Sequence, residues 1–122
     1  MSESTVKNIF LIDDEPSVLF ALKLLLGALG YEVRDFASGL DAIAALRENS
    51  PVDLILCDLK MPKIDGMGVL EEIRKIPSTV PFVLMSAHAT PEEITKAKGL
   101  GATGFLAKPF TPDQLKELVA AI

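Results

Sequence analysis

Residues 54–66 read LILCDLKMPKIDG, and this stretch decides the fold. An apolar run from Leu54 to Cys57 ends in one acid, Asp58, after which Pro62 and Gly66 turn the chain. A short run of aliphatic residues followed by turn residues is typical of a buried strand. Burying an ionised carboxylate is costly unless it is paired or bound to a metal. Asp58 therefore needs partners from other parts of the chain.

The overall composition predicts one globular domain, residues 1–122. A chain of 122 residues can bury a large core, and a hydrophobic fraction of 49% with 24% charged residues is ordinary for a folded protein. The net charge is −5, and the 12 basic residues are scattered along the sequence. This distribution argues against nucleic acid or an anionic membrane as a direct partner of the domain.

The cysteine content and the N-terminus bear on the cellular compartment. Cys57 is the single cysteine, so an internal disulfide is excluded, and its apolar neighbours predict a buried thiol. Residues Met1–Thr5 are polar and lack the apolar core of a signal peptide, and no stretch is long enough to span a membrane. These features predict a cytoplasmic protein.

Apolar runs and helical patterns alternate along the whole chain. The predicted strands are Asn8–Ile12, Tyr31–Phe36, Val52–Cys57, Pro81–Met85 and Gly101–Ala107. Apolar residues at helical spacing predict helices over 16–29, 39–49, 66–76, 91–98 and from 112 onward. The second strand alternates apolar and polar residues, which favours a position at the sheet edge.

Local signals define the helix starts and one inward face. Acidic or hydroxyl residues suitable as N-caps precede the first, third, fourth and fifth helices: Glu15, Asp65, Thr90 and Thr111. In the second helix the apolar spacing predicts that Leu40, Ile43, Ala44 and Leu46 face inward.

Strict alternation of strands and helices predicts an α/β fold with a doubly wound five-stranded parallel sheet. In the flavodoxin-like (βα)5 order 2-1-3-4-5, the strand order reverses between strands one and three, where such sheets bind ligands. Asp13 and Asp14 after strand one would then face Asp58 after strand three. Lys108 and Ser86 follow strands five and four, at the same edge.

Carboxylates gathered at one crevice repel one another unless a cation is present. Hard oxygen ligands suit Mg²⁺, and a carboxylate such as Asp58 can attack phosphorus to form an acyl phosphate. The Lys108 ammonium and the Ser86 hydroxyl can both bind a phosphoryl group. Taken singly, these residues have commoner explanations as a helix cap, a solvated lysine and a turn serine. Their shared position at one sheet edge favours a phosphoryl-transfer site.

The motifs that carry a family resemblance are Asp13-Asp14 before a helix, Asp58-Leu59-Lys60-Met61-Pro62 with Asp65-Gly66, Ser86-Ala87, and Lys108-Pro109-Phe110. In this order and spacing the chain resembles the receiver domain of response regulators in two-component signalling, as in chemotaxis regulators. The resemblance covers nearly the whole chain. It implies a signalling domain and not an enzyme, with only self-phosphorylation and autodephosphorylation chemistry of its own.

The resemblance also implies roles for individual residues. Asp58 would accept the phosphoryl group from a phosphohistidine, with Lys108 and Ser86 contacting that group. Mg²⁺ would be bound by Asp14, Asp58 and the main-chain carbonyl of Lys60, with Asp13 acting through a coordinated water. Ser86 and Phe105 would be the switch pair, and the Lys108–Pro109 bond would be cis. The output surface would be the helix over 91–98, strand five and the last helix.

The implied partners are a sensor histidine kinase or a phosphotransfer protein of a phosphorelay and a downstream effector protein or domain, with homodimer formation on phosphorylation. Lys60 stands two residues after Asp58, so its ammonium could pair with the phosphoryl oxygens or obstruct the attacking water, prolonging the phosphorylated state.

Three alternatives share parts of this pattern. A haloacid-dehalogenase-type phosphatase would require a second acid two residues after its nucleophile, where this chain has Lys60. A flavin-binding protein would require a phosphate loop after strand one, where the acidic residues would repel phosphate. A pseudo-receiver, which binds partners without being phosphorylated, is the remaining alternative, and the complete set of acids, serine and lysine counts against it.

Overall fold

The computed structural model describes residues 6–76 and 79–122. The prediction that Met1–Thr5 contain no signal peptide concerns residues outside these ranges. Strands and helices alternate through this part of the chain, as predicted. The strands are β1 (Asn8–Ile12), β2 (Glu32–Phe36), β3 (Leu54–Asp58), β4 (Phe82–Ser86) and β5 (Gly104–Ala107). The helices are α1 (Pro16–Ala28), α2 (Gly39–Arg47), α3 (Gly66–Arg74), α4 (Pro91–Gly99) and α5 (Pro112–Ala120).

The five strands form one parallel sheet in the order β2-β1-β3-β4-β5, which confirms the predicted topology. Strand β2 lies at the edge, as its alternating pattern indicates. The register pairs Ile12 of β1 with Cys57 of β3, and Ser86 of β4 with Ala107 of β5. The carboxyl ends of β1, β3, β4 and β5 therefore meet at one edge of the sheet.

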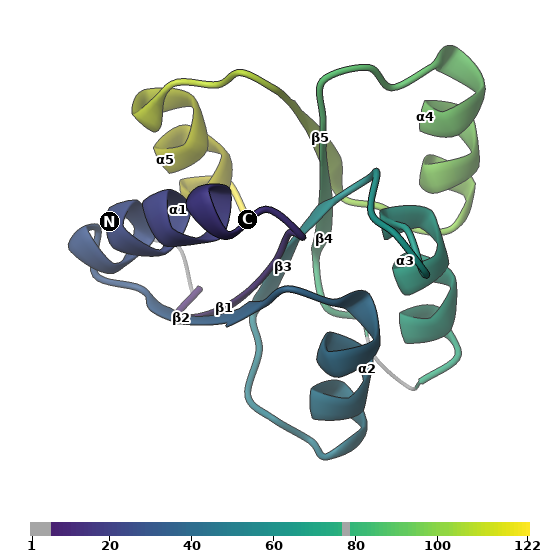
Figure 1. Cartoon of the computed structure of the whole chain (residues 1–122), viewed down its shortest axis with the longest axis horizontal. Helices are drawn as coiled ribbons and strands as arrows, with labels where there is room; N and C mark the ends of the chain where they lie inside the picture. Colours follow the sequence, from purple (N-terminus) through teal and green to yellow (C-terminus); the bar gives the residue numbers. More distant parts are fainter. Residues whose placement is uncertain (1–5, 77–78) are drawn as a thin grey trace.

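Alternate residues of each central strand enter two separate cores. Phe10, Ile55 and Leu84 belong to the core beneath α2, α3 and α4, whereas Leu11 and Leu56 belong to the core beneath α1 and α5. Figure 1 shows these two groups of helices on opposite sides of the sheet. Because β1, β3 and β4 are covered on both faces, their sequences are almost entirely apolar.

Cys57 lies in the first of these cores and is fully buried, as predicted. Burial raises the pKa of its thiol well above the ordinary value, and the negative charge of neighbouring Asp58 acts in the same direction. The thiol is therefore protonated and acts as a small apolar side chain.

Three of the four predicted N-caps are confirmed. Asp65 accepts a hydrogen bond from the Gly68 amide, while Thr90 and Thr111 each form a capping box with the residue three positions later. The prediction for α1 was wrong in detail, because Glu15 occupies the N-cap position without a side-chain bond. The acid that bonds there is Asp13, whose Oδ1 accepts from the Glu15 amide at 3.0 Å.

The predicted inward face of α2 is only partly correct. Ile43 and Leu46 are buried, but Leu40 is 52% exposed and Ala44 also faces solvent. The helix instead turns Gly39, Ala42 and Ala45 inward. A side chain at Gly39 would collide with Val69 of α3, so glycine at this position allows the two helices to pack closely. This rotation depends on the neighbouring helix and cannot be read from apolar spacing alone.

Several helices and strands are also shorter than predicted. Helices α2 and α3 end at Arg47 and Arg74, and strand β5 begins at Gly104. Asn49 and Gly101 have positive φ angles, of 61° and 92°, which end regular structure before β3 and β5. Within the described ranges, no helix is long and apolar enough to cross a membrane.

Asp53 connects the start of β3 to the start of β1. Its Oδ2 accepts hydrogen bonds from the backbone amides of Asn8 at 2.8 Å and Lys7 at 2.9 Å. These bonds, with that of Asn8 the larger effect, hold the pKa of Asp53 below its ordinary value of 3.8. The carboxylate therefore stabilises the amino ends of two central strands.

We expect Asp53→Ala to lower the free energy of unfolding at neutral pH by about 1–2 kcal/mol, because two backbone donors lose a charged acceptor. The pKa is lower in the folded chain than in the unfolded one. The stabilisation is therefore present above the unfolded-state value and is lost as the pH falls through the folded-state pKa. Urea denaturation from neutral to acidic pH measures this difference. If the difference in the free energy of unfolding between the two proteins stayed the same in acid, the prediction would be contradicted. Glu117→Ala is the control, because Glu117 is an exposed residue in the middle part of α5.

Candidate phosphoacceptor and metal site

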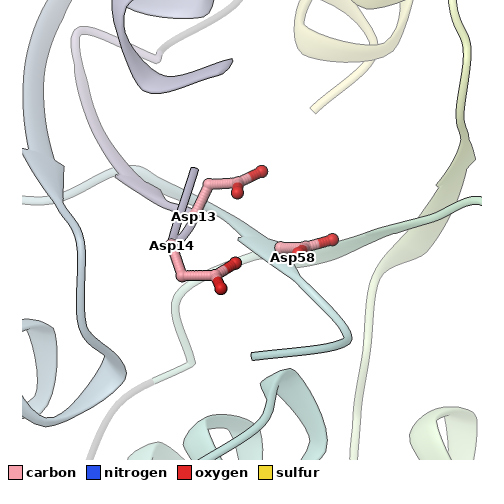
Figure 2. Close-up of side chains that lie close together, drawn as sticks. All are labelled: Asp13, Asp14 and Asp58. Atoms are coloured by element: carbon pink, nitrogen blue, oxygen red, sulfur yellow. The ribbon is translucent and has the colours of Figure 1, made fainter. Parts of the chain in front are cut away.

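Three carboxylates gather at the carboxyl edge of the sheet. Asp13 and Asp14 directly follow β1, and Asp58 is the last residue of β3. One oxygen from each side chain lies within 4.8 Å of the others, and Figure 2 shows them side by side at the ends of the two strands. Asp13 is 0% exposed and Asp58 8%, whereas Asp14 is accessible to solvent. The sequence-predicted acidic cluster thus forms, with an opening on one side.

Lys108, which directly follows the edge strand β5, forms hydrogen bonds with two of these acids. Its Nζ donates to Asp13 Oδ2 at 3.0 Å and to Asp58 Oδ1 at 3.1 Å. The backbone positions this side chain, because the Lys108 amide donates to the carbonyl of Ser86 at the end of β4. The Lys108–Pro109 peptide bond is cis, as the family resemblance implied.

The charges in the site shift the pKa values of two groups. Burial raises the pKa of Asp58, the neighbouring negative charge of Asp13 raises it further, and the Lys108 ammonium partly opposes both. For Lys108, burial lowers the pKa, but the bonds to Asp13 and Asp58 outweigh this effect and raise it overall. Lys108 is therefore a cation throughout the physiological range, yet it leaves the acids in excess.

The donor set of this site fits Mg²⁺. Carboxylate oxygens are hard ligands, and one or two protein carboxylates with room for water is the usual arrangement around this ion. One Asp13 oxygen is already bonded to the Glu15 amide and the other to Lys108. Asp14 and the second oxygen of Asp58 take no part in these bonds and therefore remain available to a metal ion.

Ser86 lies at the same edge and lines a cavity together with Phe105. Its side chain is 6% exposed and its Oγ accepts a hydrogen bond from the His88 amide at 3.1 Å. The cavity of about 390 Å³ is lined by Ser86, Ile94 of α4 and Phe105 of β5. Phe105 is partly exposed, so its ring has room to change position.

Sequence reasoning missed one contact and one steric requirement. The ammonium of Lys60, in the loop after β3, pairs with Glu93 in the first turn of α4. No local pattern in the sequence indicates this pair, because it depends on how the loop after β3 packs against the start of α4. The steric requirement is at Gly66, where a Cβ would lie 2.5 Å from the carbonyl oxygen of Asp58 and 2.6 Å from Leu84. Only glycine lets α3 begin so close to the end of β3.

A sequence match to the response regulator receiver domain spans residues 9–120. The chain belongs to this family. Two solved structures support the assignment. A receiver domain protein from Clostridium thermocellum is 32% identical, with a TM-score of 0.87 covering 93% of this chain and 91% of that one. The chemotaxis protein CheY4 of Vibrio cholerae is 28% identical, with a TM-score of 0.84 covering 94% and 97%.

Curated relatives are longer proteins that contain a similar domain. "Probable transcriptional regulator ycf27" of Porphyridium aerugineum is 34% identical over 95% of this chain and 48% of its own length. The transcriptional regulatory protein ZraR of Salmonella typhimurium is 37% identical over 90% of the chain and 25% of its own length. The chain thus spans about half of the first relative and a quarter of the second.

Family membership gives the general class of this chain. Receiver domains are signalling domains of two-component response regulators, and phosphorylation switching is their general function. They bind Mg²⁺ at an acidic pocket and interact with sensor histidine kinases and effector domains. The phosphatase and flavin-protein alternatives are therefore excluded.

We expect Gly66→Ala to lower the free energy of unfolding by about 1–3 kcal/mol, because the new methyl group would overlap the backbone after β3. Gly27→Ala in α1 is the matched control, since a Cβ there meets no atom within 4 Å. Alanine should stabilise that helix position by about 0.5–1 kcal/mol. Urea denaturation of the three proteins measures both effects. A Gly66→Ala protein as stable as wild type would show that the site loop is not sterically constrained.

Proposed function

We propose that Asp58 accepts a phosphoryl group from a phosphohistidine of a sensor kinase or phosphotransfer protein. The chain would then be a phosphorylation-dependent switch, formed by a single receiver domain over residues 1–122. One observation carries the proposal. The Asp58 carboxylate lies with Asp13 and Asp14 at the sheet edge and is hydrogen-bonded to Lys108, a cation suited to the transferred group. Family membership supports the same reaction.

Mg²⁺ would be bound by Asp14, Asp58 and the main-chain carbonyl of Lys60, with Asp13 acting through a coordinated water. This assignment is supported by the acidic cluster and by the solvent access of Asp14. When bound, the ion neutralises negative charge on the oxygens of the transferred group. Asp13, which is fully buried and bonded to Lys108, helps to position that lysine.

The residues of the chain would divide the reaction between them. A carboxylate oxygen of Asp58 attacks phosphorus while the bond between phosphorus and the histidine nitrogen breaks, and its electron pair stays on the imidazole. Lys108 donates from its ammonium to the phosphoryl oxygens and so stabilises their charge. The Ser86 hydroxyl leaves its bond to the His88 amide and contacts the same group.

The signal would travel from Ser86 to the surface formed by α4, β5 and α5. Ser86 and Phe105 line the same cavity, so a movement of Ser86 toward the phosphoryl group makes room for the Phe105 ring to turn inward. New hydrogen bonds from Ser86 and Lys108 favour the active arrangement. An effector protein or domain would read this surface, and a second copy of the chain could bind it on phosphorylation.

A pseudo-receiver that binds partners without phosphorylation is the rival function. The proposal is favoured over it because every residue needed for transfer is present, and Asp13, Asp58 and Lys108 are already in contact. Direct binding to nucleic acid through this domain is not proposed, given the net charge of −5. A cytoplasmic location stays a prediction from the sequence.

We expect the protein to form an acyl phosphate with a small phosphodonor only in the presence of Mg²⁺, and Asp58→Asn to form none. Intact-mass measurement detects the added phosphoryl group, and chelation of the metal should abolish the reaction. Asp53→Asn is the control, because this acid lies at the opposite end of the sheet. A wild-type protein that never gains the group would favour the pseudo-receiver.

We expect Ser86→Ala to be phosphorylated but to transmit the change poorly. Loss of one hydrogen bond should lower the ratio of active to inactive arrangement in the phosphorylated protein about fivefold. Amide NMR shifts of Phe105 and α4, recorded with and without beryllofluoride, measure this effect. Ser50→Ala is the control, since its hydroxyl instead accepts from Arg34. Full shifts in the Ser86→Ala protein would contradict the proposed path.

A further inference from the structure

The Lys60–Glu93 pair connects the loop that follows the phosphoacceptor to the start of α4. Lys60 stands two residues after Asp58, and its ammonium donates to Glu93 Oε2. This bond lowers the pKa of Glu93, and the bond from the Thr90 amide lowers it further. The lysine side chain is 64% exposed and that of Glu93 26%. An ion pair this exposed is weak, so another anion can displace it.

Glu93 also completes the capping box of α4. Its Oε1 accepts from the Thr90 amide at 3.0 Å, while the Thr90 hydroxyl accepts from the Glu93 amide at 3.1 Å. One carboxylate therefore holds both the first turn of α4 and the Lys60 ammonium. Movement of Lys60 would release α4 from the loop after β3 without removing the cap.

A phosphoryl group on Asp58 would compete for the same ammonium. It carries a charge of about −1.5 to −2 and three acceptor oxygens, more than the single carboxylate of Glu93. One anion would be at the end of β3, two residues before Lys60, and the other is the Glu93 carboxylate in the first turn of α4. A shift of the Lys60 ammonium toward the phosphoryl group would weaken its bond to Glu93.

We propose that Glu93 is a positioning residue that holds the Lys60 ammonium away from Asp58, and that the phosphoryl group and Glu93 compete for this lysine. This inference rests on the proposed phosphorylation of Asp58. When Lys60 binds the phosphoryl oxygens, it obstructs the attacking water, and α4 loses its bond to the loop. Glu93 thus shortens the lifetime of the phosphorylated state and couples that state to α4.

The test compares the decay of the acyl phosphate in wild type, Glu93→Gln, Lys60→Ala and the double variant, after loading with a small phosphodonor and Mg²⁺. Glutamine preserves the cap, since Gln114 fills the same role in the capping box of α5. We expect Glu93→Gln to lengthen the lifetime about two- to fivefold, the range of one exposed ion pair. Lys60→Ala should shorten it, and the double variant should match Lys60→Ala.

A matched control comes from the second ion pair on the same helix. Lys96 of α4 pairs with Glu71 of α3 at 3.5 Å, and both side chains are exposed. Glu71→Gln should leave the lifetime unchanged, although it also removes a bond that anchors α4. A change equal to that of Glu93→Gln would mean that loosening α4 is sufficient, which would overturn the role of Lys60.

The remaining outcomes separate this inference from the proposed function. A lifetime in Glu93→Gln equal to or shorter than that of wild type overturns the competition. The competition is also overturned if Glu93→Gln lengthens the lifetime in the Lys60→Ala background, or if Lys60→Ala alone has the lifetime of wild type. Wild type that never forms an acyl phosphate instead overturns the proposed function, and the inference with it.

Discussion

The rest of the site depends on the Lys108 ammonium, which lies between two buried carboxylates. Asp13 and Asp58 both come from the ends of central strands, where burial makes an unpaired charge costly. Lys108 bonds to both, at 3.0 and 3.1 Å, although it is 95 and 50 residues away from them in the sequence. Acids in excess of one lysine still leave a site that favours a divalent cation. The same charge imbalance keeps the pKa of Asp58 raised.

The charged edge can be accommodated because the two apolar cores, and not this edge, provide most of the stability of the fold. Both faces of β1, β3 and β4 are covered by helices, and the two cores contain almost all of the apolar side chains of these strands. Helix caps at Asp65, Thr90 and Thr111 satisfy backbone amides close to the same edge. Gly66 then allows α3 to start directly beside the end of β3. The core thus provides a rigid support, and polar residues at its edge are free to serve signalling.

The contacts that lead from the site toward α4 are weaker than the bonds between Lys108 and the buried acids. Ser86 is held by one bond to the His88 amide, and Lys60 by one exposed ion pair to Glu93. Such contacts contribute little to stability, and for that reason the proposed phosphoryl group on Asp58 would be able to replace them. A switch needs this property, because two arrangements must differ by only a few kcal/mol for one ligand to change their populations. Ser86 faces the Phe105 cavity, whereas Glu93 belongs to the first turn of α4, so the two links would reach different parts of one surface.

The sequence by itself determined the strand and helix order, the parallel topology, the caps at Asp65, Thr90 and Thr111, and the meeting of Asp13, Asp58 and Lys108. These features follow from local apolar patterns, cap chemistry and the rule that parallel strands end at one edge. Only the tertiary structure decided the rotation of α2, which exposes Leu40 and Ala44, and the pairing of Lys60 with Glu93. Both depend on which surfaces of distant segments face each other. That information lies in the packing of side chains and not in the periodicity of any one segment.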